Sequence, residues 1–169
     1  MLKHTKYLIT GAQLSLNGSQ ETSAGRQFNY YHPITVRYAD LDTQGHVNNA
    51  SFITYVESAR MAYYQAVGVW DGQNFNTFGM VVAEQQISYL KPIRFGQELH
   101  VGLGVSHMGT KSLEFSFQIE ESSTGMALAR GKVVMVAYDP EGEHSIPIPP
   151  AWREKINLFE KREERNDTA

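Results

Sequence analysis

The sequence predicts a single α+β domain in which one long helix packs against an antiparallel sheet. Residues 52–67 carry apolar side chains at spacings of three and four, which is typical of one face of a helix. Residues 97–107 and 111–121 alternate apolar with polar side chains, which is typical of half-buried strands. The turns between the predicted strands are short, so antiparallel pairing is favoured over parallel crossovers.

The first expected elements are a short strand and the long helix. Residues 34–38 alternate apolar and polar side chains and predict a strand. The helix should be capped by Asn48 or Asn49 and should stop at Gly68. Its apolar face is expected to comprise Phe52, Val56, Ala59, Tyr63, Ala66 and Val67.

The rest of the chain is expected to form a meander of four consecutive strands and then a short terminal helix over residues 151–165. The strands are predicted over residues 80–90, 97–107, 111–121 and 127–138. Three regions are expected overall, namely a poorly structured arm (1–30), the single domain (31–160) and a charged tail (161–169).

Composition excludes several classes of function. With 15 Lys and Arg against 18 Asp and Glu, the net charge of −3 gives no attraction to nucleic acid or to an anionic membrane. The absence of cysteine excludes disulfides, thiolate catalysis, iron–sulfur clusters and zinc fingers. The longest apolar run, residues 133–138, is far shorter than the roughly 20 residues of a membrane span. We therefore expect a cytoplasmic protein with neither a nucleic-acid nor a membrane partner.

No metal site is expected. His100 and His107 are seven positions apart in a predicted strand, so they should face opposite sides of the sheet.

The chemistry of the chain is concentrated in residues 40–49, DLDTQGHVNN, between the first strand and the helix. A helix N-terminus offers free N–H groups and the positive end of a dipole, which can polarise a carbonyl group. A nearby carboxylate could act as a nucleophile or as a general base. Such residues also cap and turn the chain without any catalytic role, and the residues alone leave both interpretations open.

Residues 33–138 resemble a hotdog-fold acyl-CoA thioesterase of the 4-hydroxybenzoyl-CoA thioesterase type. The resemblance rests on three segments, VRYADLDTQGHVNNASFITYVESAR, ISYLKPIRFGQELHVGLGV and KSLEFSFQI. It implies a central helix wrapped by an antiparallel sheet of about five strands. It also implies a homodimer joined edge to edge, often doubled to a homotetramer, with active sites at the subunit interface.

The resemblance also assigns catalytic roles by position. Asp42 corresponds to the family's catalytic aspartate, which attacks the thioester carbonyl or activates water against it. Asn49 lies where a helix N-terminal amide polarises that carbonyl, and Gly45 lets the backbone come close. His46 would orient the aspartate or only contact the cap. Glu57 matches an acidic position used in some subfamilies, although it could simply pair with Arg60 at i+3.

Substrate contacts are expected around the same segment. Gln44 and His46 also resemble the Asp-x-Asn-x-His motif of plant acyl-carrier-protein thioesterases, with Gln44 in place of the asparagine. Gln44 and the candidate cap Asn48 are therefore taken as substrate-binding. The candidates for the phosphates of coenzyme A, chosen for their charge beside strand ends and turns, are Lys91, Arg94 and Lys111. Aromatic and thioether side chains that could line an acyl pocket are Phe52, Tyr55, Phe75, Phe78 and Met80.

The function expected from the resemblance is hydrolysis of an acyl-CoA or acyl-carrier-protein thioester to a free acid. Water is the acceptor, and no cofactor is expected besides the coenzyme A of the substrate. Two alternatives stay open. One is a hydratase or dehydratase of enoyl or hydroxyacyl thioesters that uses His46 with Glu57. The other is a module that binds acyl-CoA without turnover.

Overall fold

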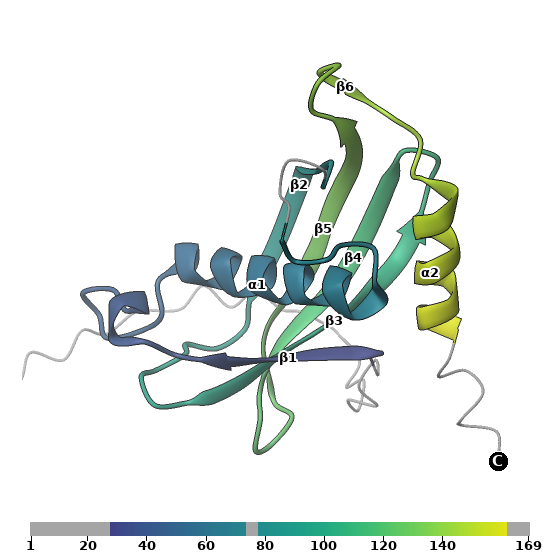
Figure 1. Ribbon diagram of the computed structural model, residues 1–169. Coiled ribbons are helices and arrows are strands. Elements are labelled where there is room, and N and C mark those ends of the chain that lie inside the picture. The colour runs from purple at the N-terminus through teal and green to yellow at the C-terminus, as the bar shows by residue number, and fades with distance from the viewer. Residues whose placement is uncertain (1–27, 74–77, 162–169) are drawn as a thin grey trace, which may run out of the picture.

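The computed structural model describes residues 28–73 and 78–161, where one sheet is crossed by a long helix (Figure 1). Most of the expected arm and tail therefore lies outside the described residues, as does Phe75. The elements are β1 (Tyr30–Thr35), the 3-10 turn η1 (Tyr38–Asp40), α1 (Asn49–Val67), β2 (Met80–Tyr89), β3 (Glu98–Met108), β4 (Ser112–Glu121), β5 (Ala127–Asp139), β6 (His144–Ser145) and α2 (Pro150–Lys161).

The main strands pair antiparallel in the order β1-β3-β4-β5-β2, and the short β6 pairs with the end of β5. The expected meander is right for β3, β4 and β5 but wrong for β2, which pairs with β5 at the far edge. The chain between β1 and β2 includes α1, whose 19 residues span about 28 Å. The start of α1 lies beside the end of β2, where Phe52 contacts Tyr89, and its second half lies beside the first residues of β2, so α1 runs alongside this edge strand in the opposite direction.

The hydrophobic core lies between α1 and the facing side of the sheet. Alternate residues of the strands are buried there, including Leu113, Phe115, Phe117 and Ile119 of β4. The predicted helix face is confirmed at Phe52, Val56, Ala59 and Tyr63, while Val67 is half-buried and Ala66 is exposed. Burial of this apolar surface is the main stabilising contribution to the fold.

The first strand begins and ends earlier than the predicted range of 34–38. Pairing with β3 covers Tyr30 to Thr35, and the chain then turns through η1. The turn forms because the N–H of Arg37 donates to Oδ2 of Asp40 at 2.8 Å. Val36 is nevertheless buried, so the alternation identified an inward side chain correctly but not the end of the strand.

His100 and His107 lie on the same face of the sheet, contrary to the expectation that they face opposite sides. A bulge between Val105 and His107 adds one residue, so the two histidines stand opposite Glu120 and Glu114. Six positions along β4 separate these partners by about 20 Å. Within the described ranges, no three His, Asp or Glu side chains gather as metal ligands.

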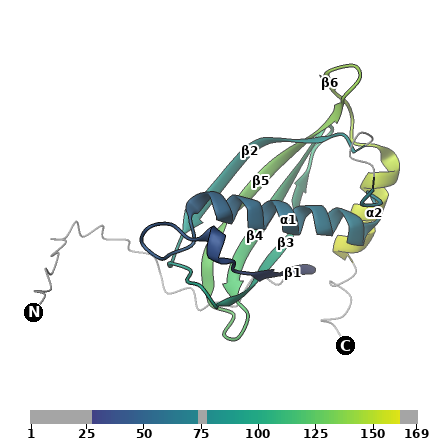
Figure 2. The ribbon, with the colours of Figure 1, turned by 60° about the vertical axis from the view of Figure 1, so that its left-hand side comes forward.

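The second helix, α2, packs near the end of α1 and against β3 (Figure 2). Oε1 of Glu160 in α2 accepts hydrogen bonds from the hydroxyl of Tyr63 at 2.6 Å and from the N–H of Val105 at 2.8 Å. The bulge in β3 thus gives α2 a fixed attachment to the sheet. Neither α1 nor α2, over their described residues, is long and apolar enough to cross a membrane.

Candidate active site

The loop between η1 and α1 folds into a small closed turn. The N–H of Asp42 donates to the carbonyl of His46 at 2.8 Å, and the N–H of Gly45 donates back to Asp42 at 3.1 Å. Gly45 has a φ of 76°, a backbone conformation that favours glycine, and open space surrounds its Cα. The turn is joined to the segment before β3 by a hydrogen bond of 2.8 Å from Val47 to Ile93.

This turn fixes the carboxylate of Asp42. Its Oδ1 accepts the backbone N–H of Gln44 at 2.8 Å and that of His46 at 3.3 Å. No hydrogen bond within the described residues involves Oδ2. The half-buried side chain is therefore held by one oxygen, while the other is left for an incoming group.

The N-terminus of α1 adjoins this carboxylate. Asn48 is the N-cap, and its side chain accepts the N–H of Ala50 at 2.9 Å. The carbonyl of Asn48 accepts the N–H of Ser51 at 2.9 Å. Among the described residues, no group accepts the N–H of Asn49, the first helical residue. One N–H at the positive end of the helix dipole is thus available to a ligand.

Asp42 and Asn49 line one open cleft of about 380 Å³. Its other lining residues come from the start of α1 and from the end of β2, namely Val47, Phe52, Tyr89, Leu90, Lys91 and Pro92. Phe52 packs edge-on against Tyr89 with 5.0 Å between the ring centroids. The cleft therefore combines a carboxylate, a free helix N–H, an ammonium group and an aromatic wall.

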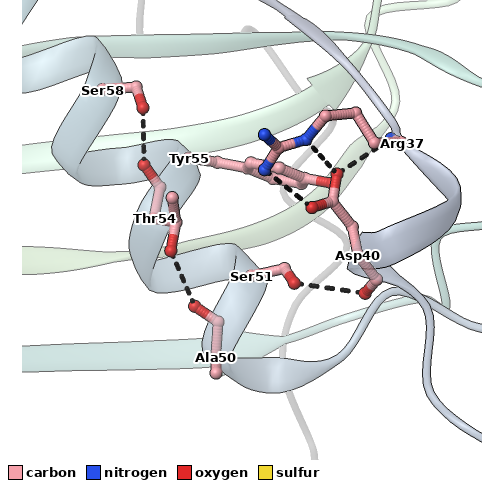
Figure 3. Close-up of polar contacts among 7 residues, drawn as sticks. All are labelled: Arg37, Asp40, Ala50, Ser51, Thr54, Tyr55 and Ser58. Carbon is pink, nitrogen blue, oxygen red and sulfur yellow. Dashed lines mark hydrogen bonds and ion pairs between the residues drawn. The ribbon is translucent and has the colours of Figure 1, made fainter.

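A hydrogen-bond network centred on the buried Asp40 joins the start of this loop to α1 (Figure 3). The guanidinium of Arg37 donates to both carboxylate oxygens, at 2.9 and 3.3 Å, and the hydroxyl of Tyr55 donates to Oδ2 at 2.8 Å. The carbonyl of Asp40 accepts the N–H of Asn48 at 2.8 Å and the hydroxyl of Ser51 at 3.1 Å. Asp40 thus connects the end of β1 to the start of α1.

The same network sets the charge state of Asp40. Burial favours the neutral carboxyl, but the hydrogen bonds from Arg37 and Tyr55 and the charge of Arg37 outweigh it, so the pKa of Asp40 lies below its ordinary value. Burial and the hydrogen bond to Asp40 raise the pKa of Tyr55. At neutral pH the pair is therefore a carboxylate and a neutral phenol.

Several predicted site residues come together at the loop, and others do not. Gln44, Gly45 and His46 belong to the turn that holds Asp42, and the bridge between His46 and Arg94 brings Arg94 beside it. Lys111 lies at the turn between β3 and β4, near the far end of β3 and about 33 Å along that strand from the Arg94 end. Its ammonium group donates to the carbonyl of Ser145 at 2.7 Å.

Glu57 lies away from Asp42, along α1. Its side chain is 61% exposed, and Oε1 is 3.8 Å from a terminal nitrogen of Arg60. Glu57 and Arg60 line a second cavity beside the first residues of β2, together with Phe78 and Met80. Of the expected acyl-pocket residues within the described ranges, only Phe52 lines the cleft at Asp42, and Tyr55 is buried against Asp40.

Sequence reasoning missed five contributors to these sites. Val47 lies within the predicted segment, but Tyr89, Leu90 and Pro92 lie at or just after the end of β2, far along the chain from Asp42. Arg60 is 4% exposed although it belongs to a charged residue type, and the spacing of the helix suggested only a surface ion pair with Glu57. A signal was available for Arg60, because it lies four positions after the buried Val56 and four before the buried Tyr64, on one face of the helix.

Fold and site together define a hotdog thioesterase, with the long helix resting on the antiparallel sheet and a carboxylate at the helix entry. The family described as the Thioesterase-like superfamily matches residues 36–156, and the chain belongs to it. The C-terminal domain of acyl-ACP thioesterases also matches, over residues 6–65.

Relatives and solved structures agree with this family. A thioesterase of Thermus thermophilus, solved with coenzyme A and Zn, is 36% identical, with a TM-score of 0.72 over 82% of this chain and 98% of that one. The long-chain acyl-CoA thioesterase FadM of Escherichia coli is 26% identical over 76% of this chain and 97% of its own length. The 1,4-dihydroxy-2-naphthoyl-CoA hydrolase of Thermosynechococcus vestitus is 28% identical over 70% and 84%.

Proposed function

We propose that this thioester hydrolase cleaves acyl-CoA to a free acid and coenzyme A in the cleft beside Asp42. The observation that carries the proposal is the position of two groups on one cleft, the carboxylate of Asp42 and the unaccepted N–H of Asn49. The Escherichia coli relative, named as an acyl-CoA thioesterase, and the Thermus structure with bound coenzyme A support this substrate class.

In one mechanism, Asp42 acts as a general base. Its carboxylate takes a proton from water while the water oxygen bonds to the thioester carbon. The N–H of Asn49 stabilises the negative charge that develops on the carbonyl oxygen. The tetrahedral intermediate then collapses, the C–S bond breaks, and the proton passes to the leaving thiolate.

In the other mechanism, the carboxylate of Asp42 attacks the thioester carbon itself. The C–S bond breaks to release coenzyme A, and a mixed anhydride remains on the enzyme. Water then hydrolyses the anhydride to the free acid and restores the carboxylate. Both mechanisms use the same two groups of the chain, and neither requires a metal or redox cofactor.

Coenzyme A is expected to bind at the rim of the cleft, through Lys91 and Arg94. Lys91 lines the cleft, while Arg94 is exposed and bridges to His46 of the catalytic turn. Both can pair with phosphate groups without losing a strong partner, because within the described residues neither forms an ion pair. Lys111 is left out of this assignment because its ammonium group is bound to Ser145 at the distant turn.

We infer that the complete site forms between two copies of the chain joined through β2. This edge strand and the residue after it expose four large apolar side chains, Val81, Val82, Tyr89 and Leu90. The cleft lies at the Tyr89 end of β2, and the cavity with Glu57 lies at the Met80 end. Antiparallel pairing of two β2 strands brings opposite ends together, so Glu57 of the partner subunit would face the cleft.

The proposed reaction is tested by thiol release from acyl-CoA substrates of increasing chain length, including aromatic ones. The protein has no cysteine, so it contributes no background thiol. Release of thiol together with free acid supports the proposal. Loss of enoyl absorbance without thiol release would instead indicate a hydratase, and tight binding without turnover would indicate an acyl-CoA-binding module.

A further inference from the structure

The second cavity lies between α1 and the start of β2 and has a volume of about 660 Å³. Most of its lining is apolar, which suits a hydrocarbon chain. The exceptions are Glu57 and Ser58 at the exposed side and two buried groups, Arg60 and Tyr64. The apolar residues are Met61, Phe78, Met80, Val81, Val82 and Met135.

Arg60 is a buried cation without a hydrogen bond among the described residues. Its side chain is 5% exposed, and Nε is buried with no partner. The nearest charge is Oε1 of Glu57 at 3.8 Å, which is beyond hydrogen-bonding distance. A guanidinium group has five N–H donors, and the one on Nε is enclosed without an acceptor. Such a group is costly to bury unless another molecule satisfies it.

Tyr64, one helical turn after Arg60, adds a second unused group. Its hydroxyl is buried and has no hydrogen-bond partner among the described residues. Burial raises the pKa of this phenol, and the charge of Arg60 acts in the opposite direction, which places the hydroxyl within the field of the guanidinium. The phenol is therefore neutral and able to donate. The cavity lining thus includes two neighbouring buried side chains, and Nε of one and the hydroxyl of the other have no hydrogen-bond partner among the described residues.

We propose that this cavity is a subsite for acyl groups that end in a carboxylate, which Arg60 and Tyr64 would bind. A carboxylate supplies two acceptor oxygens and the charge that the guanidinium lacks, and it matches the fork of an arginine in a bidentate pair. The methylene groups of such a substrate would lie along the methionine and valine side chains. This inference rests on the proposed thioesterase function and names its substrate class.

Glu57 does not supply the carboxylate that Arg60 and Tyr64 lack. Its carboxylate is mostly solvated at the rim, and its distance from Arg60 leaves the buried Nε unsatisfied. In the proposed pairing through β2, the cavity faces the cleft of the partner subunit. A thioester held at Asp42 of one protomer could then extend its acyl group into the cavity of the other.

The test compares matched pairs of substrates that differ only at the far end of the acyl chain. Each pair consists of a straight-chain acyl-CoA and the ω-carboxyl acyl-CoA of equal length, over chains of about four to twelve carbons. We expect wild type to prefer the carboxylated member by at least about tenfold in kcat/KM, mainly through KM. Equal rates for both members, or a preference for the plain chain, at every length would overturn the proposal.

Two variants assign the preference to the cavity. Arg60→Met keeps an unbranched, flexible side chain but removes the charge and the donors, so the preference should fall to about one. Tyr64→Phe should lower it several-fold. Arg130→Met, at an exposed arginine of β5, is the matched control and should leave the ratio unchanged. Loss of preference in Arg130→Met, or full preference in Arg60→Met, would refute the assignment.

Inhibition measurements on wild type keep the test independent of how the variants fold. A free α,ω-dicarboxylic acid should inhibit turnover of a plain acyl-CoA more strongly than the monocarboxylic acid of equal length, and equal inhibition would contradict the subsite. Different results would reject the thioesterase function and the carboxylate subsite. Absence of thiol release from every substrate would reject the thioesterase proposal, whereas release without a carboxylate preference would reject only this subsite.

Discussion

The hydroxyl of Tyr55 in α1 donates a hydrogen bond of 2.8 Å to Oδ2 of Asp40, fifteen residues earlier in the chain. Both groups are buried, and Arg37 binds the same carboxylate from the other side. The bond attaches the long helix to the segment that enters the turn of residues 42–46. The position of Asp42 therefore depends on a carboxylate that itself lies outside the cleft.

Removal of the Tyr55 hydroxyl should weaken this attachment. In Tyr55→Phe, Oδ2 of the buried Asp40 loses one donor, and we expect the free energy of unfolding to fall by about 1–3 kcal/mol. Urea unfolding measures the change. Tyr38→Phe is the matched control, because Tyr38 is 82% exposed and its substitution should cost almost nothing. Equal losses in the two variants would contradict the role of the buried bond.

The contribution of Asp40 should depend on pH in a definite direction. Its pKa is lower in the folded protein than the ordinary value of 3.8, so folding favours the carboxylate. The resulting stability is fully present above about pH 4 and is lost as the pH falls through the lowered folded-state pKa. The difference in unfolding free energy between wild type and Asp40→Asn should therefore be largest near neutral pH and smaller at pH 3. If the difference in unfolding free energy instead grew as the pH fell, the predicted direction would be wrong.

The left-handed backbone conformation of Gly45 allows an experiment that distinguishes a loss of stability from a loss of activity. Gly45→Ala introduces no clash, so its cost should be the strain of φ, about 1–2 kcal/mol. Gly125→Ala is matched, with a φ of 68° and equally open surroundings in the turn between β4 and β5. Both variants should lose similar stability in thermal unfolding, but only Gly45→Ala should lower kcat/KM. If Gly45→Ala and Gly125→Ala changed kcat/KM equally, the proposed role of the turn at Gly45 in catalysis would be contradicted.

The proposed pairing through β2 predicts that one exposed side chain controls the oligomeric state. Val82 of β2 is 48% exposed, and Val82→Lys places a charge in the proposed interface. We expect light scattering to show a dimer or tetramer for wild type and a smaller species for this variant. Leu158→Lys is the control, because Leu158 is 63% exposed on α2, outside the proposed interface. A monomeric wild type would reject the composite site.

The sequence predicted those features that neighbouring residues determine. Asn48 and Gly68 act within one turn of α1, so the cap and the stop of the helix were visible in the spacing, and both bounds are confirmed. The alternation in residues 111–121 likewise matches β4, because a two-residue period directly reports a half-buried strand. The segment of Asp42 could be located for the same reason, since it adjoins the helix cap.

Features that depend on distant partners were not predictable in this way. The place of β2 at the sheet edge depends on its pairing with β5, a strand much later in the chain than the β3 that follows β2. Tyr55 was assigned to the acyl pocket because an aromatic on an apolar face gives no sign of a buried carboxylate fifteen residues away. Lys111 was assigned to coenzyme A for its charge beside a predicted turn, and only the fold reveals its attachment to Ser145.

The most direct test of the account is the rate of thiol release by Asp42→Asn. The asparagine oxygen can still accept the N–H groups of Gln44 and His46, so the turn should persist while the carboxylate is lost. Asp139→Asn is the matched control, because Asp139 accepts the N–H of Glu141 at 3.0 Å in a similar turn outside the cleft. We predict a fall in kcat of at least about 100-fold for Asp42→Asn and an unchanged rate for Asp139→Asn. Equal rates for wild type and Asp42→Asn would contradict the central claim that this carboxylate performs the hydrolysis.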